Sequence, residues 1–506
     1  MRTSLTIAVV LMLVLAGCAQ APGSSTTTET TQPATDEQET DDGSDGDGDS
    51  GTDEREIIKP ADPEQDALGW EDGYWYNETI NVTPEDGLNE SELDKVVARS
   101  MARVERVRGL EFDERVPVEI QTREEFRAEQ GNRSMSPDRR VFDNTKFESL
   151  FMIGEDTDSI AVQNSNSGSA IGGFYSPSEE KIVVVSENAT TPQLNEITLS
   201  QELFHALQDQ KYDLTSFNQS TRELHNAKDG VIEGDGNYVD YLYERRCTQE
   251  WGGDCLTPQS QPGQGDGLAN MGPYLLKFQP YSDGPAFVEE VYEEGGWEAV
   301  NALYEDPPES TEQVIHPDKY GEDDPAEFSV PDRSGDGWER MTFDGRPNYA
   351  SVGEAGIFSM FMYPYYDSEG QTQIVPAQEF FNINESTGEL RSFDPLNYES
   401  DYSEGWDGDK LVVYTSDTTE QNETGYVWKS VWDSEADAEE FVEGYREVLD
   451  YNDATEVDGR ENTWRIEGEA FGDAFYVHQD GDTVVVVNAP TVEDLPGVWE
   501  DAPAEE

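Results

Sequence analysis

The chain of 506 residues has 110 acidic against 32 basic residues, and its formal net charge of −78 excludes nucleic-acid binding, because phosphate contacts need clustered lysine and arginine. Such self-repulsion opposes compaction in dilute buffer. At molar salt the Debye length falls to about 3 Å, and most of that repulsion is screened. The composition is therefore typical of proteins that work in concentrated salt.

The N-terminus predicts export. An apolar run from Leu5 to Ala16 is too short to span a bilayer and is typical of a signal-peptide core. The run ends in Leu15-Ala16-Gly17-Cys18, which resembles a bacterial-type lipobox, so we interpret residues 1–18 as a lipoprotein signal peptide with Cys18 as the lipidated residue. The alternative is an ordinary signal with a chance cysteine. The lipid would hold the protein on the extracellular face of the membrane.

Residues 19–65 are predicted to be a disordered tether. A threonine-rich stretch gives way to one of aspartate and glycine between Asp41 and Asp49. Almost nothing there can be buried and the like charges repel, so the segment favours extended conformations. It would lift the folded part away from the membrane.

The rest of the chain is too long for one small core and predicts two domains. The first is expected at residues 66–397 as an α+β domain. Hydrophobic periodicity and turn residues predict its elements. In chain order these are a helix at Leu93–Leu110, strands at Val116–Ile120 and Lys181–Val185, and helices at Leu194–Asp213, Thr221–Arg246 and Pro285–Tyr304.

The predicted helix at Leu194–Asp213 carries an almost complete metal-binding motif. Gln201-Glu202-Leu203-Phe204-His205 is H-E-x-x-H with glutamine in place of the first histidine. In a zinc peptidase the two histidines lie one helical turn apart and bind the same ion, and the glutamate polarises a water on the metal. Glu202 is thus the candidate general base and His205 a candidate ligand, while Gln201 stands where a ligand is missing.

The next predicted helix supplies a third candidate. Glu233 lies within it, in Val231-Ile232-Glu233-Gly234-Asp235-Gly236. A strand, a helix with the motif and a second helix with a glutamate follow one another as in the core of a gluzincin site. Just after this helix, Cys247 and Cys255 are expected to form a disulfide in an oxidising compartment, with free thiols or a metal pair as alternatives.

The second domain is expected at residues 398–500 as a small α+β unit. Strands are predicted at Leu411–Tyr414, Gly425–Trp428 and Thr483–Val487, and the apolar residues between Ala438 and Leu449 form one face of a helix. The unit carries no catalytic signature, so packing or recognition is its expected role. N-glycosylation sequons, which mark surface positions of an exported protein, occur at Asn77, Asn81, Asn89, Asn132, Asn188, Asn218, Asn384 and Asn422.

The longer motifs resemble those of a known group. Zinc-metallopeptidase-like proteins of bacteria and archaea carry H-E-L-x-H-A-L-Q-D-Q and, after a spacer, E-G-D. This chain has Gln201–Gln210 and Glu233–Asp235 at these places, and Ser310–Tyr320 is similar to the S-T-E-Q-x-x-H-P-x-K-Y stretch of the group. Ser351–Glu354 and Gly405–Leu411 are similar to two later landmarks. In particular, the chain resembles a family of haloarchaeal surface lipoproteins.

The resemblance implies a zincin-like fold with Glu202 as general base and with His205 and Glu233 as zinc ligands. A substrate strand would pair with the sheet edge near Ile182–Val185. The departure is Gln201, because an amide is a poorer zinc ligand than an imidazole. Three outcomes stay open: an empty site, a weak or different metal held partly by Gln201, or a replacement ligand from elsewhere.

The chain has three other histidines. His225 lies two helical turns before Glu233, roughly 11–12 Å away, which is too far to share one ion with it. His316 is the candidate for an oxyanion or substrate contact, with a structural hydrogen bond as the alternative. His478 is expected to be a strand residue of the second domain.

Three hypotheses about function follow. The first is a lipid-anchored surface protein whose metallopeptidase-like domain has lost or weakened its catalysis and binds a peptide or an envelope protein. The second is an active zinc-dependent peptidase outside the membrane. The third is a solute-binding or structural lipoprotein, for which the motif match would be accidental.

Overall fold

The computed structural model describes residues 61–502 apart from the short segments 84–86, 132–134, 171, 187–190, 193, 252–254, 258–267, 336, 385, 417–422 and 469. The predicted signal peptide, Cys18 and the tether up to residue 60 lie outside the described residues. Among the described residues, none of the helices has both the length and the apolar character needed to cross a bilayer.

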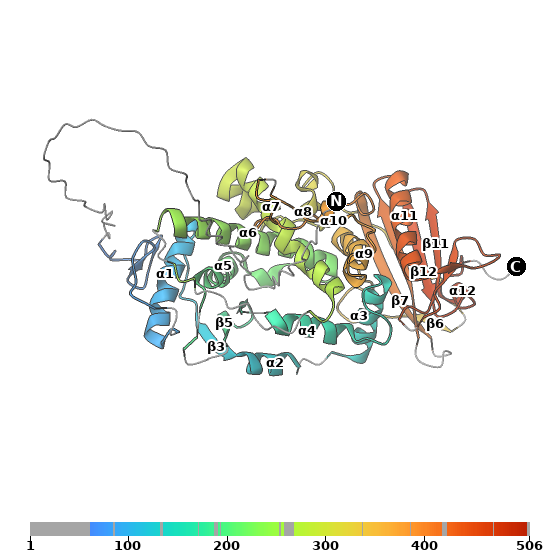
Figure 1. The fold of residues 1–506 in the computed structure, drawn as a ribbon, viewed down its shortest axis with the longest axis horizontal. Helices are drawn as coiled ribbons and strands as arrows, with labels where there is room; N and C mark the ends of the chain where they lie inside the picture. The colour runs from blue at the N-terminus through green and yellow to red at the C-terminus, as the bar shows by residue number, and fades with distance from the viewer. Residues whose placement is uncertain are drawn as a thin grey trace, which may run out of the picture.

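Helices and two main sheets make up the fold, so the α+β class is confirmed. Figure 1 shows α1 at one end, the large sheet at the other, and α6 and α7 between them. The helices are α1 (Glu90–Arg108), α2 (Arg123–Gly131), α3 (Pro137–Ser149), α4 (Ser159–Ala170), α5 (Glu196–Tyr212), α6 (Arg222–Gln249), α7 (Met271–Ala302), α8 (Glu312–Ile315), α9 (Gly353–Asp367), α10 (Ala377–Phe380), α11 (Glu435–Tyr451) and α12 (Leu495–Val498), with 3-10 turns η2 (Leu214–Ser216) and η3 (Pro317–Lys319).

The strands form one hairpin and two sheets. The hairpin pairs β1 with β2, the small sheet has the order β3-β5-β4, and the large sheet has the order β6-β7-β8-β12-β11-β10-β9. Their bounds are β1 (Trp70–Glu71), β2 (Tyr74–Trp75), β3 (Val118–Thr122), β4 (Gly173–Ser176), β5 (Lys181–Ser186), β6 (Trp338–Arg340), β7 (Trp406–Ser416), β8 (Thr424–Trp432), β9 (Thr455–Glu456), β10 (Thr463–Arg465), β11 (Ala474–Asp480) and β12 (Thr483–Ala489).

The small sheet corrects the predicted substrate edge. Strand β5, which contains Ile182–Val185, is central: it pairs in parallel with β3 and antiparallel with β4. Both edges of β5 are therefore occupied, because each neighbour takes one row of its backbone hydrogen bonds. The terminal strand on the side of the motif helix is β4 instead.

The helix that supplies much of the central packing begins earlier than predicted. α7 starts at Met271, where the side chain of Asn270 accepts a hydrogen bond from the Gly272 amide, and it continues through Pro280 and Pro285. A start at Pro285 would agree with the preference of proline for the first helical turn. Tertiary packing overrides that preference here, since Gly284 lies directly against Gly230 of α6.

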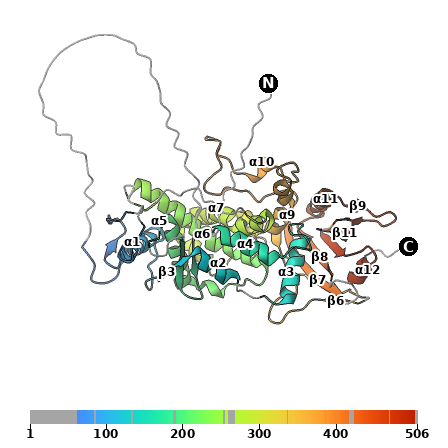
Figure 2. The ribbon, with the colours of Figure 1, turned by 60° about the horizontal axis from the view of Figure 1, so that its bottom comes forward.

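The large sheet is covered on both faces. α11 packs on one face together with α3 and α9, and α12 and Trp499 pack on the other. The core of the first face is continuous with α3, α7 and α9, so it extends across the boundary predicted between the two domains. The view in Figure 2 shows α3 and α9 beside β7 and β8.

Candidate functional site

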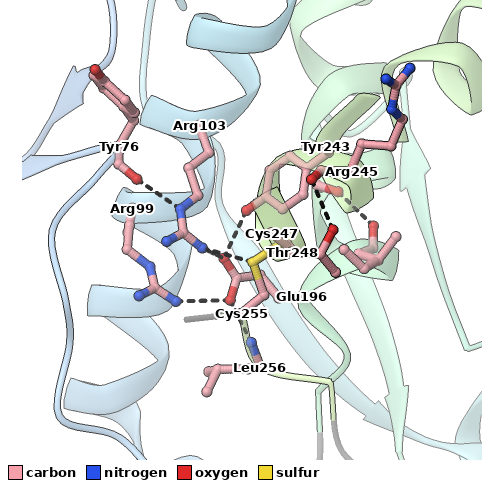
Figure 3. Close-up of a disulfide and its surroundings, with 12 residues drawn as sticks. Tyr76, Arg99, Arg103, Glu196, Tyr243, Arg245, Cys247, Thr248, Cys255 and Leu256 are labelled. Carbon is pink, nitrogen blue, oxygen red and sulfur yellow. Dashed lines mark hydrogen bonds and ion pairs between the residues drawn. A yellow bond between two sulfur atoms is a disulfide. The ribbon is translucent and has the colours of Figure 1, made fainter. Parts of the chain in front are cut away.

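The motif helix is anchored at its first residue by a buried network of charges (Figure 3). The carboxylate of Glu196 accepts hydrogen bonds from Arg99 at 2.8 Å and from Arg103 at 2.6 Å, both on α1. It also accepts from the hydroxyl of Tyr243 at 2.7 Å and from the amide of Leu256 at 2.8 Å. Burial alone would raise the pKa of Glu196, but the two arginines outweigh it and the pKa is lowered.

A disulfide lies against this network. Cys247, in the last turn of α6, is joined to Cys255, and their Cα atoms are 5.8 Å apart. The Arg103 guanidinium approaches the sulfur of Cys255 at 3.2 Å. The disulfide and the network together tie α1, the start of α5 and the end of α6 to one another, which fixes the angle at which α5 enters the core.

The structure places Gln201, Glu202 and His205 inside the protein, with exposed fractions of 2%, 4% and 9%. One carboxylate oxygen of Glu202 accepts a hydrogen bond from the backbone N–H of Tyr175 on β4, at 2.8 Å. Burial raises the pKa of Glu202 to about 7, against the opposing charge of His205. A carboxyl with a pKa near neutrality is suited to take up a proton from water at neutral pH.

His205 is held in one orientation by the residue one turn further along α5. Its Nδ1 lies 2.7 Å from Oε1 of Gln208. The amide nitrogen of Gln208 in turn faces Ile232 O and the hydroxyl of Tyr304. Because both amide hydrogens have acceptors, Oε1 must accept from His205, and Nε2 is left to face Glu233.

Glu233 completes the group from α6. Its Oε2 lies 3.3 Å from Nε2 of His205, and its Oε1 accepts from the hydroxyl of Tyr281 at 2.8 Å. Burial lowers the pKa of His205, but the charge of Glu233 outweighs burial and raises it to about 10. Gly236 keeps the approach open, since a Cβ there would lie only 3.1 Å from Cε1 of His205.

These residues fit part of a zinc site. Oε2 of Glu233 is buried, and its contact among the described residues is the 3.3 Å ion pair with Nε2 of His205. Ligands about 2.0–2.2 Å from a tetrahedral zinc ion lie roughly 3.3–3.6 Å from one another, which is also the separation of these two atoms. A catalytic zinc site takes three protein ligands, so the fit is complete only if Gln201 supplies the third.

The two middle residues of the Glu233–Gly236 segment face other helices. Gly234 packs on Gly284 of α7, where a Cβ would meet the backbone at 2.4 Å. Asp235 accepts from Arg108 of α1 and from the hydroxyl of Tyr304. The segment therefore combines one candidate ligand with the close contacts that position it.

His316 lies elsewhere in the fold. Its Nε2 is 3.0 Å from Oε1 of Glu354, which is fully buried at the start of α9. Among the described hydrogen bonds and ion pairs, His316 makes none to Glu202, His205 or Glu233. Its role as an oxyanion or substrate contact stays a prediction.

The second-half landmarks form a polar junction near His316. Asp409 of β7 accepts from the hydroxyl of Ser351, the amides of Val352 and Gly353, and the indole of Trp428. Thr311 donates to Glu223 at the start of α6. These contacts join the helical part to the large sheet.

The other two histidines have local neighbours. Nε2 of His225 lies 3.3 Å from Asp229, one turn further along α6. His478 lies in β11, as the strand prediction required.

Sequence reasoning missed the residues that orient the three candidates. Gln208 follows His205 by three residues, so helical spacing alone offered a signal for it. Tyr175 and Tyr281 reach the site from β4 and α7 through tertiary packing, and the sequence around them carries no signal for that contact.

Residues 339–499 match a family described as Domain of unknown function (DUF8575). This region contains α9 and almost all of the large sheet, and it leaves Gln201, Glu202, His205 and Glu233 outside it. The boundary predicted between residues 397 and 398 falls within the matched region. No curated protein and no solved structure matches the chain.

Proposed function

We propose that this chain is a lipid-anchored protein of the outer cell surface of a halophilic archaeon, with a zincin-like domain whose catalysis is lost or weakened. Its role is to bind a peptide or an envelope protein. The observation that carries the proposal is the pairing of His205 with Glu233 beside a buried Gln201. Two ligand positions are kept in contact, and the third holds an amide.

The surroundings of this pair support an origin as a metal site. Gln208 orients the imidazole and Tyr281 orients the carboxylate, as outer residues do around zinc ligands. If each ligand contributes about 3–4 kcal/mol of a total of 10–16, Gln201 weakens zinc binding by roughly a hundredfold to a thousandfold.

The binding role is supported by the place of β4. It is the terminal strand of the small sheet on the side of Glu202, and the Tyr175 N–H on that side already donates to Glu202. An extended peptide could add to such an edge through backbone hydrogen bonds.

An active peptidase is the second candidate, and Glu202 is the observation that favours it. Its raised pKa and its orientation by Tyr175 N–H equip it to accept a proton from an attacking water. Zinc, when bound by Gln201, His205 and Glu233, would act as a Lewis acid on the substrate carbonyl.

Metal content separates the two candidates. We would purify the full chain in molar KCl and measure zinc by mass spectrometry, beside Gln201→His and Gln201→His/His205→Ala. The proposal predicts little zinc in the native protein, near one zinc per chain in Gln201→His, and loss of that zinc in the double variant. Circular dichroism would confirm that all three are folded.

Two results would overturn the proposal. The first is near one zinc per chain in the native protein that a further variant, His205→Ala alone, loses. This result would favour an active peptidase, and peptide hydrolysis would then be measured with Glu202→Gln as the inactive control. A folded Gln201→His protein that gains no zinc would show that the site has no metallopeptidase geometry.

A further inference from the structure

Three carboxylates meet where the helical part contacts the large sheet. Glu148 lies in the last turn of α3, Glu155 in the loop after it, and Asp473 directly before β11. Ligand oxygens of all three lie within 4.8 Å of one another. Glu148 and Asp473 are buried, whereas Glu155 is exposed and leaves a route from solvent. We call these residues the acidic triad.

Backbone contacts hold the triad in place. The amide of Glu155 donates to Ala470 O at 3.0 Å, and the amide of Gly472 donates to the Glu155 carboxylate at 3.1 Å. Gly154 fits directly against Ala470, where a Cβ would meet the backbone at 2.7 Å. The carboxylates are therefore brought together by the docking of two loops that are far apart in the sequence.

The charge of the triad has no basic partner at ion-pair distance among the described residues. A second cluster shows the contrast: Glu312, Asp323 and Asp433 surround Lys319, whose Nζ lies 2.6, 3.3 and 2.8 Å from them. There the ammonium group supplies the positive charge. Burial and the charges of Asp473 and Glu155 raise the pKa of Glu148. Burial also raises the pKa of Asp473, against its hydrogen bonds with Asn488 and Glu148 and the more distant charge of Arg465.

A residue that contacts the triad carries an unpartnered oxygen. Asn488 donates from Nδ2 to Asp473 at 2.9 Å, but its Oδ1 is buried without a hydrogen-bond partner. Tyr426 is the cross-strand neighbour of Asn488, so both side chains lie on the sheet face that packs against α3. The Tyr426 hydroxyl pairs with that of Tyr445, and both Tyr426 and Asn488 are 1% exposed.

We propose that Glu148, Glu155 and Asp473 bind a divalent cation of the calcium type, with Oδ1 of Asn488 as a neutral oxygen ligand. The donors are all oxygens, which suits a hard cation and disfavours zinc or copper. A cation would neutralise the buried carboxylates and occupy the unpartnered oxygen. It would clamp the end of α3 to the strand start at Asp473.

The test uses the full chain in molar KCl, which screens loose binding of cations to the acidic surface. Chelator-treated protein would be unfolded thermally with and without CaCl2. Native protein and Asp433→Asn, a control in the cluster that holds Lys319, should unfold at higher temperature with calcium. Glu148→Gln should not respond, because it lacks one of the two buried carboxylates.

Terbium luminescence, sensitised by nearby tyrosines, measures binding directly. The affinity for Tb³⁺ should fall at least about tenfold in Glu155→Gln. This substitution is at an exposed position and tests the proposal even if Glu148→Gln does not fold. Equal calcium responses in all variants, no response in any, or a response to MgCl2 without one to CaCl2 would overturn the proposal.

Discussion

At the scale of single residues, the candidate site shows how closely function and packing share a short segment. On α6, Glu233 faces His205 and Gly236 leaves room for the imidazole ring, while Gly234 and Asp235 face α7 and α1. Glu233 and Gly236 therefore bear directly on His205, while Gly234 and Asp235 hold α6 against α7 and α1.

Glu196→Gln should lower the free energy of unfolding by about 3–5 kcal/mol, because it leaves Arg99 and Arg103 buried without a carboxylate. Urea unfolding in molar KCl measures the change. Glu119→Gln removes an exposed partner of Lys181 and should leave the free energy of unfolding nearly unchanged. Since the pKa of Glu196 is lowered by folding, its contribution is full above the ordinary pKa and is lost as the pH falls. A loss for Glu196→Gln no larger than that for Glu119→Gln would contradict the account.

At this scale the sequence predicted the three central candidates because they lie at helical spacing or in a short motif. The structure brings Glu202, His205 and Glu233 together. Tyr281 was missed because it reaches Glu233 only through the packing of α7 on α6. Such contacts depend on the relative position of two helices, which local periodicity does not encode.

At the scale of elements, periodic helices were predicted well and interrupted ones were not. The amphipathic patterns of α1 and α11 gave their extents to within a few residues. α7 contains Pro280, Gly284 and Pro285, which favour a break in any local analysis. It is helical because the glycine admits close contact with α6, and this packing offsets the backbone hydrogen bonds that the prolines remove.

The start of α9 offers a prediction about backbone geometry. Gly353 has φ +69°, and a Cβ there would lie 1.6 Å from the Glu223 carboxylate. Gly353→Ala should therefore lower the free energy of unfolding by several kcal/mol, from backbone strain and displacement of Glu223 together. Gly321→Ala is the matched control, with φ +75° and no heavy atom within 4 Å of the added Cβ, and should cost only about 1–2 kcal/mol. Thermal unfolding of both variants checks this, and equal losses would refute the role of Glu223.

At the scale of the whole molecule, the two parts share one core and one polar junction. Phe151, after α3, contacts the rings of Tyr445, Phe471 and Phe475 in the sheet region. The sequence predicted two domains because it shows two sets of elements, but it carries no signal for how much surface they bury against each other.

The polar junction gives stability a dependence on pH. Burial raises the pKa of Glu223 to about 8, against the hydrogen bonds from Thr311. Because this value lies above the ordinary one of 4.5, the contribution of Glu223 to stability is full below pH 4.5 and is lost as the pH rises through 8. Between pH 6 and pH 9 the melting temperature should fall, and it should fall less in Glu223→Gln, which cannot titrate. Melting curves in molar KCl test this; an unchanged pH dependence in the variant would count against it.

The shared core includes residues outside the region that matches a family. Residues 339–499 keep almost all of the large sheet but not α3, whose apolar side chains cover part of one sheet face, or α7, which packs on α9 in the same core. Excised at those bounds, the region would present that face to water. In this chain the matched region is thus smaller than the unit that folds, because helices that precede it in the sequence complete its core.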